Sequence, residues 1–240
     1  MKEESTMNIK GSVALVTGAN RGLGRALALE LAARGAKVYA AARDPSTVKD
    51  AGLIPVQLDA TNDESIKALV AQLEDVNLLV NNAGVAQVME STLDPQFLAV
   101  YERLSAVNFG GLVKVTQAFV PLILRNGGGV INVLSDATWF SRPLLAAYSA
   151  SKSAAWSYTN ALRVEFQDRL QVLAIHVGFL DTDMTKGFDM NKTAPADVAS
   201  QAADALEAGR YEVLADAGTQ ALKASLTSDR PYYVHPPEIA

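Results

Sequence analysis

The sequence predicts a single α/β domain with a doubly wound sheet of about seven parallel strands and helices on both faces. Three observations predict this class. Short apolar runs alternate with helical stretches along the 240 residues, a glycine cluster follows the first run, and no Pro-, Gly- or Ser-rich linker divides the chain. Strands that alternate with helices in this way are typical of βαβ units in a covered parallel sheet.

The first strand is expected at Ser12–Thr17, a short apolar run that ends in glycines as a buried parallel strand does. A helical stripe from Leu23 to Ala33 follows it, and Gly35 stands where that helix would stop. Further elements of the amino-terminal half are expected as strands at Lys37–Ala42, Leu53–Leu58 and Val76–Val80, and as helices at Asn62–Leu73, with Asn62 or Asp63 as its cap, and at Phe97–Leu124.

The carboxyl-terminal half continues the same alternation. Strands are expected at Val130–Leu134, Gln171–Val177 and Tyr211–Ala215, and helices at Ser149–Asp168 and Pro195–Ala208, the latter with proline near its first turn. An alanine-rich helix then precedes a Pro-rich tail over 230–240, and residues 1–10 form a polar extension. All of 1–240 is therefore read as one domain.

Composition excludes several classes of site. The chain has no cysteine and two histidines, so disulfides, cysteine nucleophiles and thiolate metal centres are excluded, and no metal site is expected. The net charge of −5 argues against a nucleic-acid partner, which basic clusters would bind. No secretory leader and no apolar run of about 18 residues is recognised. We expect a cytoplasmic protein without a membrane partner.

The glycine cluster, Thr17-Gly18-Ala19-Asn20-Arg21-Gly22-Leu23-Gly24, lies between the first strand and the first helix. Residues without a Cβ let the backbone approach a pyrophosphate at a helix amino terminus, where the amides and the helix dipole favour anions. An ordinary glycine-rich turn is the alternative. The position at the first strand, turn and helix favours a nucleotide phosphate.

The end of the second strand bears on the choice of cofactor. An acidic residue there would bind a ribose 2′-hydroxyl, whereas an arginine accommodates a 2′-phosphate. The strand ends in alanines, with Arg43 directly after Ala42, and Arg21 in the glycine turn is a second cation. This pattern favours NADP(H), unless Arg43 and Asp44 are only solvated loop charges.

Tyr148 and Lys152 are four residues apart and therefore share one face of a helix, and Ser135 precedes them at the end of a strand. An ammonium beside a phenol would lower the phenol pKa from about 10 toward neutrality. Such a tyrosine can exchange a proton with a carbonyl or an alcohol. A Tyr-x-x-x-Lys pair alone is commonly just helix surface, but here it occurs together with the glycine turn.

Taken together, the motifs identify the chain as similar to the classical short-chain dehydrogenase/reductase family, from about Lys10 to Thr185. Asn81-Asn82-Ala83-Gly84 resembles the family's NNAG motif. The resemblance implies a Rossmann-type fold, a carbonyl reductase or alcohol dehydrogenase that uses NADP(H), and a catalytic set. That set consists of Asn108, Ser135, Tyr148 and Lys152.

By matching position, the resemblance also implies individual roles. Tyr148 would be the general acid or base, Lys152 would lower its pKa, Ser135 would hold the substrate oxygen, and Asn108 would hold a relay water. The implied cofactor contacts are Gly18, Asn20, Arg21, Gly22, Leu23, Gly24, Arg43, Asp59, Ala60, Asn82, Ala83, Gly84, Tyr148, Lys152, Gly178, Leu180 and Thr182.

Two departures from the family pattern stand out. Val177-Gly178 replaces the usual Pro-Gly, and the carboxyl terminus differs from the segment that packs across an oligomer axis in many relatives. A homodimer or homotetramer is expected without a choice between them.

Substrate specificity is expected to come from an apolar lining and a lid at 183–194, which suits apolar or aromatic ketones and aldehydes. The expected lining residues are Val85, Gln87, Met89, Trp139, Phe140, Leu144, Leu145, Phe179, Met184 and Phe188.

Two other functions remain open. A catalytically idle NADP(H)-binding sensor could use the same fold. A serine hydrolase would need Gly-x-Ser-x-Gly, whereas Ser135 lies in Val-Leu-Ser-Asp-Ala. His176 is expected to be a core histidine.

Overall fold

A computed structural model describes residues 7–236. It contains one sheet of seven parallel strands in the order β3-β2-β1-β4-β5-β6-β7, which confirms the predicted fold class. The strands are β1 Val13–Thr17, β2 Lys37–Ala42, β3 Leu53–Gln57, β4 Leu78–Asn81, β5 Gly128–Val133, β6 Leu170–His176 and β7 Glu212–Leu214. Parts of the expected amino-terminal extension (1–6) and Pro-rich tail (237–240) lie outside the described residues.

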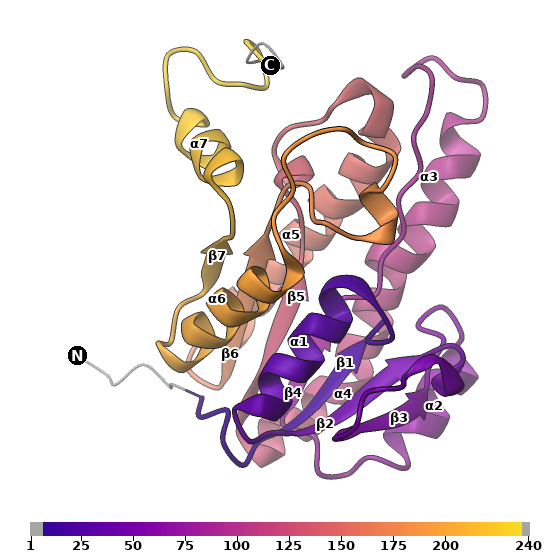
Figure 1. Ribbon diagram of the computed structural model, residues 1–240, viewed down its shortest axis with the longest axis vertical. Helices are drawn as coiled ribbons and strands as arrows, with labels where there is room; N and C mark the ends of the chain where they lie inside the picture. Colours follow the sequence, from indigo (N-terminus) through magenta and orange to yellow (C-terminus); the bar gives the residue numbers. More distant parts are fainter. Residues whose placement is uncertain (1–6, 237–240) are drawn as a thin grey trace.

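Helices cover both faces of the sheet, with α1 and α6 on one face and α4 and α5 on the other (Figure 1). The helices are α1 Gly22–Ala33, α2 Asp63–Val70, α3 Phe97–Ser105, α4 Leu112–Asn126, α5 Ala146–Phe166, α6 Pro195–Glu207 and α7 Ala217–Ser225. Alternation along β1 divides the core, because Ala14 and Val16 pack with α1 residues whereas Leu15 packs with α4 residues.

Short 3₁₀ turns connect several of these elements. They are η1 Pro45–Thr47, η3 Asp136–Thr138, η4 Pro143–Leu145 and η5 Asp183–Thr185. The turn η4 leads directly into α5, which therefore begins three residues before the expected Ser149 and includes Tyr148. Asn62 caps α2 as expected, but the helix ends at Val70 and not at Leu73.

The expected uninterrupted helix Phe97–Leu124 is wrong in one respect. A π-helical segment, η2 Ala106–Gly111, separates α3 from α4 and contains Asn108. A Cβ at Gly111 would lie 3.1 Å from the Cβ and 3.2 Å from the carbonyl oxygen of Ala60, so the glycine permits a close approach. Single-turn π segments of this kind are frequent at functional sites.

The combined run Phe97–Asn126 is also long and apolar enough to cross a membrane, by length and composition, and its most apolar window has a mean hydropathy of 1.5. The expectation that the chain has no apolar run of this length is therefore wrong. Half of its most apolar window is buried against the rest of the fold.

The strand order reverses direction between β1 and β4. In open α/β sheets, ligands bind outside the carboxyl ends of the strands at this switch point. The glycine turn after β1 and the Asn82–Gly84 segment after β4 both begin there.

Candidate active site

The glycine turn adopts a conformation that requires glycine at three positions. Gly18 and Gly22 have φ angles of 64° and 54°, in the left-handed region that glycine favours. A Cβ at Gly24 would overlap the carbonyl oxygen of Gly18 and the Nδ2 atom of Asn82. Asn20 and Arg21 complete the turn, and Leu23 is buried in the first turn of α1.

Hydrogen bonds fasten the turn to the segment after β4. The Thr17 hydroxyl oxygen accepts from the backbone N–H groups of Asn82 and Ala83, each at 3.0 Å. The Asn82 amide donates to the carbonyl oxygens of Thr17 at 2.9 Å and Gly18 at 3.2 Å. Asn82, expected as a cofactor contact, thus uses its amide nitrogen to hold the glycine turn in place.

The four residues of the expected catalytic set come from η2, the end of β5 and the first two turns of α5. The Lys152 Nζ atom lies 5.9 Å from the centre of the Tyr148 ring and donates to Val133 O at 2.9 Å. A Cβ at Gly84 would lie 3.3 Å from Asn108 Oδ1 and 3.7 Å from Lys152 Nζ, so both polar atoms border this glycine. The NNAG segment and the catalytic set therefore form one site.

Asn108 is 1% exposed, and both its side-chain oxygen and its side-chain nitrogen form hydrogen bonds. Its Oδ1 accepts from Val85 N at 2.8 Å, and its Nδ2 donates to Val85 O and to the Ser151 hydroxyl, both at 2.9 Å. Asn108 thereby holds the loop after β4 against α5. A carbonyl oxygen has a second lone pair, so Oδ1 can still accept one more hydrogen bond.

A carboxylate that the sequence analysis did not single out lies beside the expected catalytic serine. The Ser135 hydroxyl donates to Asp136 Oδ1 at 3.0 Å and accepts from the backbone N–H of Ala137 at 3.1 Å. Arg142 donates from Nη2 to Asp136 Oδ2 at 2.7 Å. The guanidinium of Arg142 also lies 5.2 Å and 5.4 Å from the centres of the Phe140 and Phe179 rings.

The expected lowering of the Tyr148 pKa toward neutrality is wrong for this form of the protein. Burial raises the pKa of Tyr148 to about 12; the hydrogen bond with Ser135 lowers it, and the negative charge of Asp136 raises it further. Burial also lowers the pKa of Lys152 to about 8. Desolvation of both groups outweighs the effect expected from their i, i+4 spacing.

His176 supports the backbone of the same serine. Its side chain is fully buried, and Nδ1 lies 3.1 Å from Ser135 O, so the neutral ring must donate from Nδ1. Burial lowers the pKa of His176 to about 3. The ring stacks on Trp139 at a centroid distance of 3.9 Å, which places Trp139 in this cluster and argues against its expected role in the pocket lining.

A buried chain of amides and hydroxyls lies behind the site and was also missed. Asn81 Nδ2 donates to Thr116 Oγ1 and Asn132 Oδ1, and Asn132 Nδ2 donates to Thr159 Oγ1, each at 2.9 Å. These residues connect β4, β5, α4 and α5. The available signal was polar residues within otherwise apolar strands, because buried polar groups need partners.

The end of β2 and the loop after β3 form the other side of the switch point. Arg43 is exposed, and its charge lowers the pKa of Asp59, after the larger effect of hydrogen bonds from Thr61. Asp59 Oδ1 accepts from the Thr61 backbone at 2.9 Å and from its hydroxyl at 2.7 Å. Ala60 lies against Gly111. The strand β2 ends without an acidic residue, and the cation Arg43 follows it directly. This arrangement fits a ligand that carries a phosphate on its adenosine ribose.

The segment after β6 reaches the glycine turn. A Cβ at Gly22 would lie 3.4 Å from Thr182 Cγ2, so Thr182 borders that turn as expected for a cofactor contact. Gly178 N donates to Asp216 Oδ2 at 2.9 Å, and Leu180 forms a bridge with Thr193. This bridge closes the base of the expected lid at 183–194.

Apolar side chains gather on the segments around Ser135 and Tyr148. Val85, Leu144 and Met184 are 36%, 48% and 52% exposed. The rings of Phe179 and Phe188 are 5.1 Å apart, which joins the segment after β6 to the lid. Met89 is instead buried with α3 residues, and Gln87 accepts a hydrogen bond from Arg103. Leu145 is half-buried at the start of α5.

Comparisons with known proteins identify the family to which this fold belongs. A family model described as short chain dehydrogenase matches residues 12–193. A short chain dehydrogenase from Burkholderia cenocepacia J2315, solved in complex with NADP, is 36% identical with a TM-score of 0.87, over 93% of this chain and 96% of that one.

Curated relatives include an 11-beta-hydroxysteroid dehydrogenase 1A from Arabidopsis thaliana, 29% identical over 75% of this chain and 55% of that protein. A 3-oxoacyl-[acyl-carrier-protein] reductase from Synechocystis sp. is 34% identical over 75% of this chain and 79% of that protein. The chain thus spans about half the length of the first of these relatives.

Proposed function

The chain belongs to the short chain dehydrogenase family, and from this premise we propose that it is an NADP(H)-dependent carbonyl reductase that also runs in reverse as an alcohol dehydrogenase. The observation that carries the proposal is the position of Ser135, Tyr148 and Lys152. Lys152 Nζ lies 5.9 Å from the centre of the Tyr148 ring. Lys152 and Asn108 border Gly84, and the segment that contains Gly84 is hydrogen-bonded to the glycine turn at the switch point of the sheet.

The choice of NADP(H) is supported by Arg43 and Arg21. Neither is buried, no acidic residue ends β2, and Arg21 makes only a long contact of 3.5 Å with Asp183. Both guanidinium groups can therefore turn to a 2′-phosphate. The relative from Burkholderia cenocepacia, solved with NADP, supports this choice, although another relative was solved with NAD.

The glycine turn, Thr182 and Lys152 would bind the cofactor. The turn presents backbone amides at the start of α1 for a pyrophosphate. Lys152 has three N–H donors, one of which is used by Val133 O. The others can bind ribose hydroxyls. A bound NADPH supplies the hydride.

Tyr148 would be the proton donor in the reduction. Because its pKa is about 12, the phenol is protonated at neutral pH and can donate to a carbonyl oxygen as reduction proceeds. Ser135 places a second hydroxyl beside the same oxygen. Lys152 and a water on the free lone pair of Asn108 Oδ1 would return a proton to Tyr148.

The substrate class we propose is apolar or aromatic ketones and aldehydes. The apolar side chains around the site, Val85, Leu144, Phe140, Phe179 and Met184, support it. So do the names of the two curated relatives, a hydroxysteroid dehydrogenase and an oxoacyl reductase.

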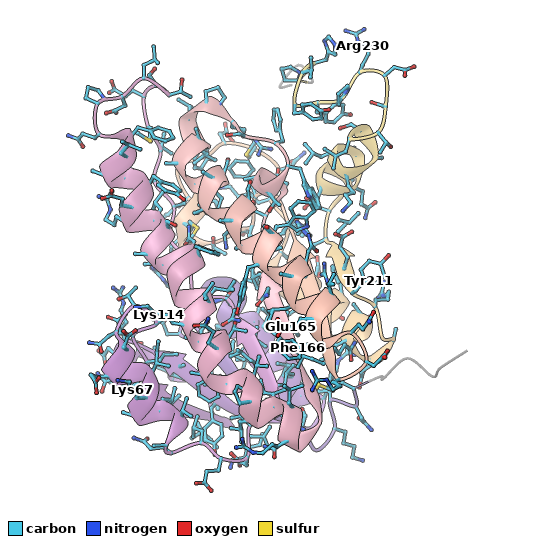
Figure 2. All side chains as sticks on the ribbon, turned by 180° about the vertical axis from the view of Figure 1, so that it is seen from behind. Lys67, Lys114, Glu165, Phe166, Tyr211 and Arg230 are labelled. Carbon is cyan, nitrogen blue, oxygen red and sulfur yellow. The ribbon has the colours of Figure 1, made fainter. Side chains whose placement is uncertain are left out.

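From the sequence we expect a homodimer or a homotetramer. We also expect a cytoplasmic protein. The face that carries α4 and α5 is open in the single chain (Figure 2), and Val164 on it is 77% exposed. The alternative function is an idle NADP(H)-binding sensor.

The test is consumption of NADPH or NADH with a panel of aryl and alkyl ketones, polyols and charged keto acids. We expect apolar ketones to be reduced, with NADPH preferred at least tenfold in kcat/KM, which is about 1.4 kcal/mol in transition-state binding. Turnover of polyols or carboxylates alone would overturn the substrate class. An equal use of NADH would overturn the cofactor choice.

A further inference from the structure

Arg142 joins two segments that are far apart in the sequence. Its guanidinium carbon lies 5.2 Å from the centre of the Phe140 ring and 5.4 Å from the centre of the Phe179 ring. Phe140 follows the turn η3, whereas Phe179 follows β6, and both rings are half-buried. A guanidinium within about 6 Å of a ring centre is attracted to the face of that ring. Arg142 thus holds the two phenylalanines on either side of the loop together.

An ion pair fixes Arg142 in this position. Its Nη2 donates to Asp136 Oδ2 at 2.7 Å, and the side chains of Asp136 and Arg142 are 9% and 28% exposed. A charge-assisted bond at this degree of burial fixes the orientation of the guanidinium. A Cβ at Gly178 would lie 3.7 Å from the same oxygen, so the pair also borders the residue before Phe179.

Phe179 is attached to both parts of the lid at 183–194. Its ring lies 5.1 Å from the ring of Phe188 within the lid, at an interplanar angle of 56°. At the end of the lid, Thr193 N donates to Phe179 O at 2.9 Å, and Asp181 N donates to Thr193 O at 3.0 Å. A contact that fixes Phe179 therefore also restrains the lid.

We propose that Arg142 is a positioning residue that sets the substrate specificity of the proposed reductase site: held by Asp136, it fixes Phe179 and thereby holds the lid over the pocket that takes the larger substituent of a ketone. This inference rests on the proposed function. Arg142 acts through the rings of Phe179 and Phe188, which form an aromatic wall of that pocket.

A protease can measure how firmly the lid is held. Lys186 is exposed within the lid and is followed by Gly187, so trypsin can cut there. The cut requires the local turn to open, because Lys186 N donates to Asp183 O at 3.5 Å and Phe188 N donates to Thr185 O at 3.0 Å. The rate of this cut therefore reports the open fraction of the lid and needs no turnover.

The first measurement is limited trypsin digestion of the full-length protein, with Arg142→Lys and Phe179→Leu as variants. Lysine keeps a positive charge beside Asp136 but lacks the guanidinium plane that lies over two rings, and leucine removes one of those rings. In both variants we expect the cut after Lys186 to become about fivefold faster. The cut after the exposed Lys49, in the loop before β3, is the internal reference and should keep its rate.

The second measurement connects the lid to specificity, by comparing phenyl methyl ketone with acetone as substrates for NADPH oxidation. Acetone is too small to reach the aromatic wall. For both variants we expect the KM for phenyl methyl ketone to rise about fivefold with kcat within about twofold, because the wall binds ground state and transition state alike. The kcat/KM for acetone should stay within about twofold of the wild type. A displacement of Ser135 or Tyr148 would instead lower kcat for both ketones.

Arg169→Lys is the matched control. The guanidinium of Arg169 lies 5.3 Å from the centre of the Phe166 ring. Phe166 is the last residue of α5 (Figure 2), so this contact lies at the opposite end of the helix from Tyr148. The same substitution in the same kind of contact should leave the cut after Lys186 and both KM values at the wild-type level.

The outcomes separate this inference from the proposed function. If the wild type reduces no ketone in a Tyr148-dependent way, the proposed function fails, and the digestion still tests whether Arg142 and Phe179 hold the lid. If the wild type reduces both ketones but the variants keep its cleavage rate and KM values, or lose kcat equally with both ketones, the role of Arg142 is overturned while the proposed function stands. Should one variant fail to fold, the other carries the test, because both weaken the same contact.

Discussion

Burial sets the protonation of two side chains beside the Ser135 and Tyr148 hydroxyls. Lys152 is 4% exposed and has its pKa lowered to about 8, and His176 is fully buried with a pKa of about 3. At pH 7 the lysine therefore remains mostly charged, whereas the histidine is neutral and donates to Ser135 O. A neutral histidine there fixes the serine backbone without placing a second positive charge near Lys152.

At the scale of this residue we predict a pH-dependent stability. Unfolded His176 gains a proton near pH 6.5, but the folded side chain does so only near pH 3. The contribution of neutral, buried His176 to the free energy of unfolding should therefore be complete above pH 6.5. It should be lost as the pH falls toward 3, by up to about 1.4 kcal/mol per pH unit. Urea denaturation between about pH 5.5 and 6.5 measures this slope above the range where most carboxylates titrate.

His176→Gln keeps an N–H donor for Ser135 O but does not titrate, so its slope over this range should be nearly flat. His235→Gln is the matched control, since His235 is exposed and is the chain's other histidine. An unchanged slope in His176→Gln, or a flattened one in His235→Gln, would show that a different group takes up the proton.

At the scale of elements, helix α7 supports the turn after β6. Asp216 caps α7 by accepting from Thr219 N at 2.8 Å, and it also accepts from Gly178 N at 2.9 Å. The family's usual Pro-Gly is Val177-Gly178 here. The hydrogen bond that Gly178 N donates to the helix cap Asp216 thus provides some of the restraint that a proline ring would provide. The two departures from the family pattern, the Val177-Gly178 turn and the different carboxyl-terminal segment, are thus connected through Asp216.

Replacing Asp216 tests this connection. Asp216→Ala removes a helix cap and leaves Gly178 N without its acceptor, so we expect a loss of about 2 kcal/mol in the free energy of unfolding. The KM for the ketone should rise several-fold, because Phe179 follows this turn. Both are measured by urea denaturation and steady-state kinetics.

Asn62→Ala is the comparison, because the Asn62 side chain caps α2 by accepting from Glu64 N and Ser65 N, and both of these partners lie within that helix. It should cost about 1 kcal/mol and leave the KM unchanged. Equal stability losses in the two variants, with equal KM values, would mean that Asp216 is only a cap.

For the whole molecule, the sheet order brings together residues far apart in the sequence. The ends of β1, β4, β5 and β6 meet at one edge, which places the glycine turn, Gly84, Ser135 and Thr182 around a single site. The helix α5, which covers the face of the sheet opposite to α1 and α6 (Figure 1), supplies Tyr148 and Lys152.

Much of this could be predicted from the sequence, because strand periodicity and the glycine turn are local signals. The π-helical break at Ala106–Gly111 could not, since it depends on the approach of Gly111 to Ala60. The pKa values of Tyr148 and Lys152 also could not, because burial depends on the whole fold. Asp136 was adjacent to Ser135 in the sequence, but its hydrogen bonds with Ser135 and with Arg142, six residues later, depend on how the loop folds.

The most direct test of the central claim compares the wild type with Tyr148→Phe, by measuring NADPH binding and NADPH consumption with an apolar ketone in the same preparations. Phe keeps the ring that packs with α3 and removes only the proton-donating hydroxyl. We predict that NADPH binds both proteins with Kd values within about threefold, and that turnover falls at least about a hundredfold in the variant. Tight NADPH binding with no turnover in either protein, or full turnover in Tyr148→Phe, would contradict the assignment.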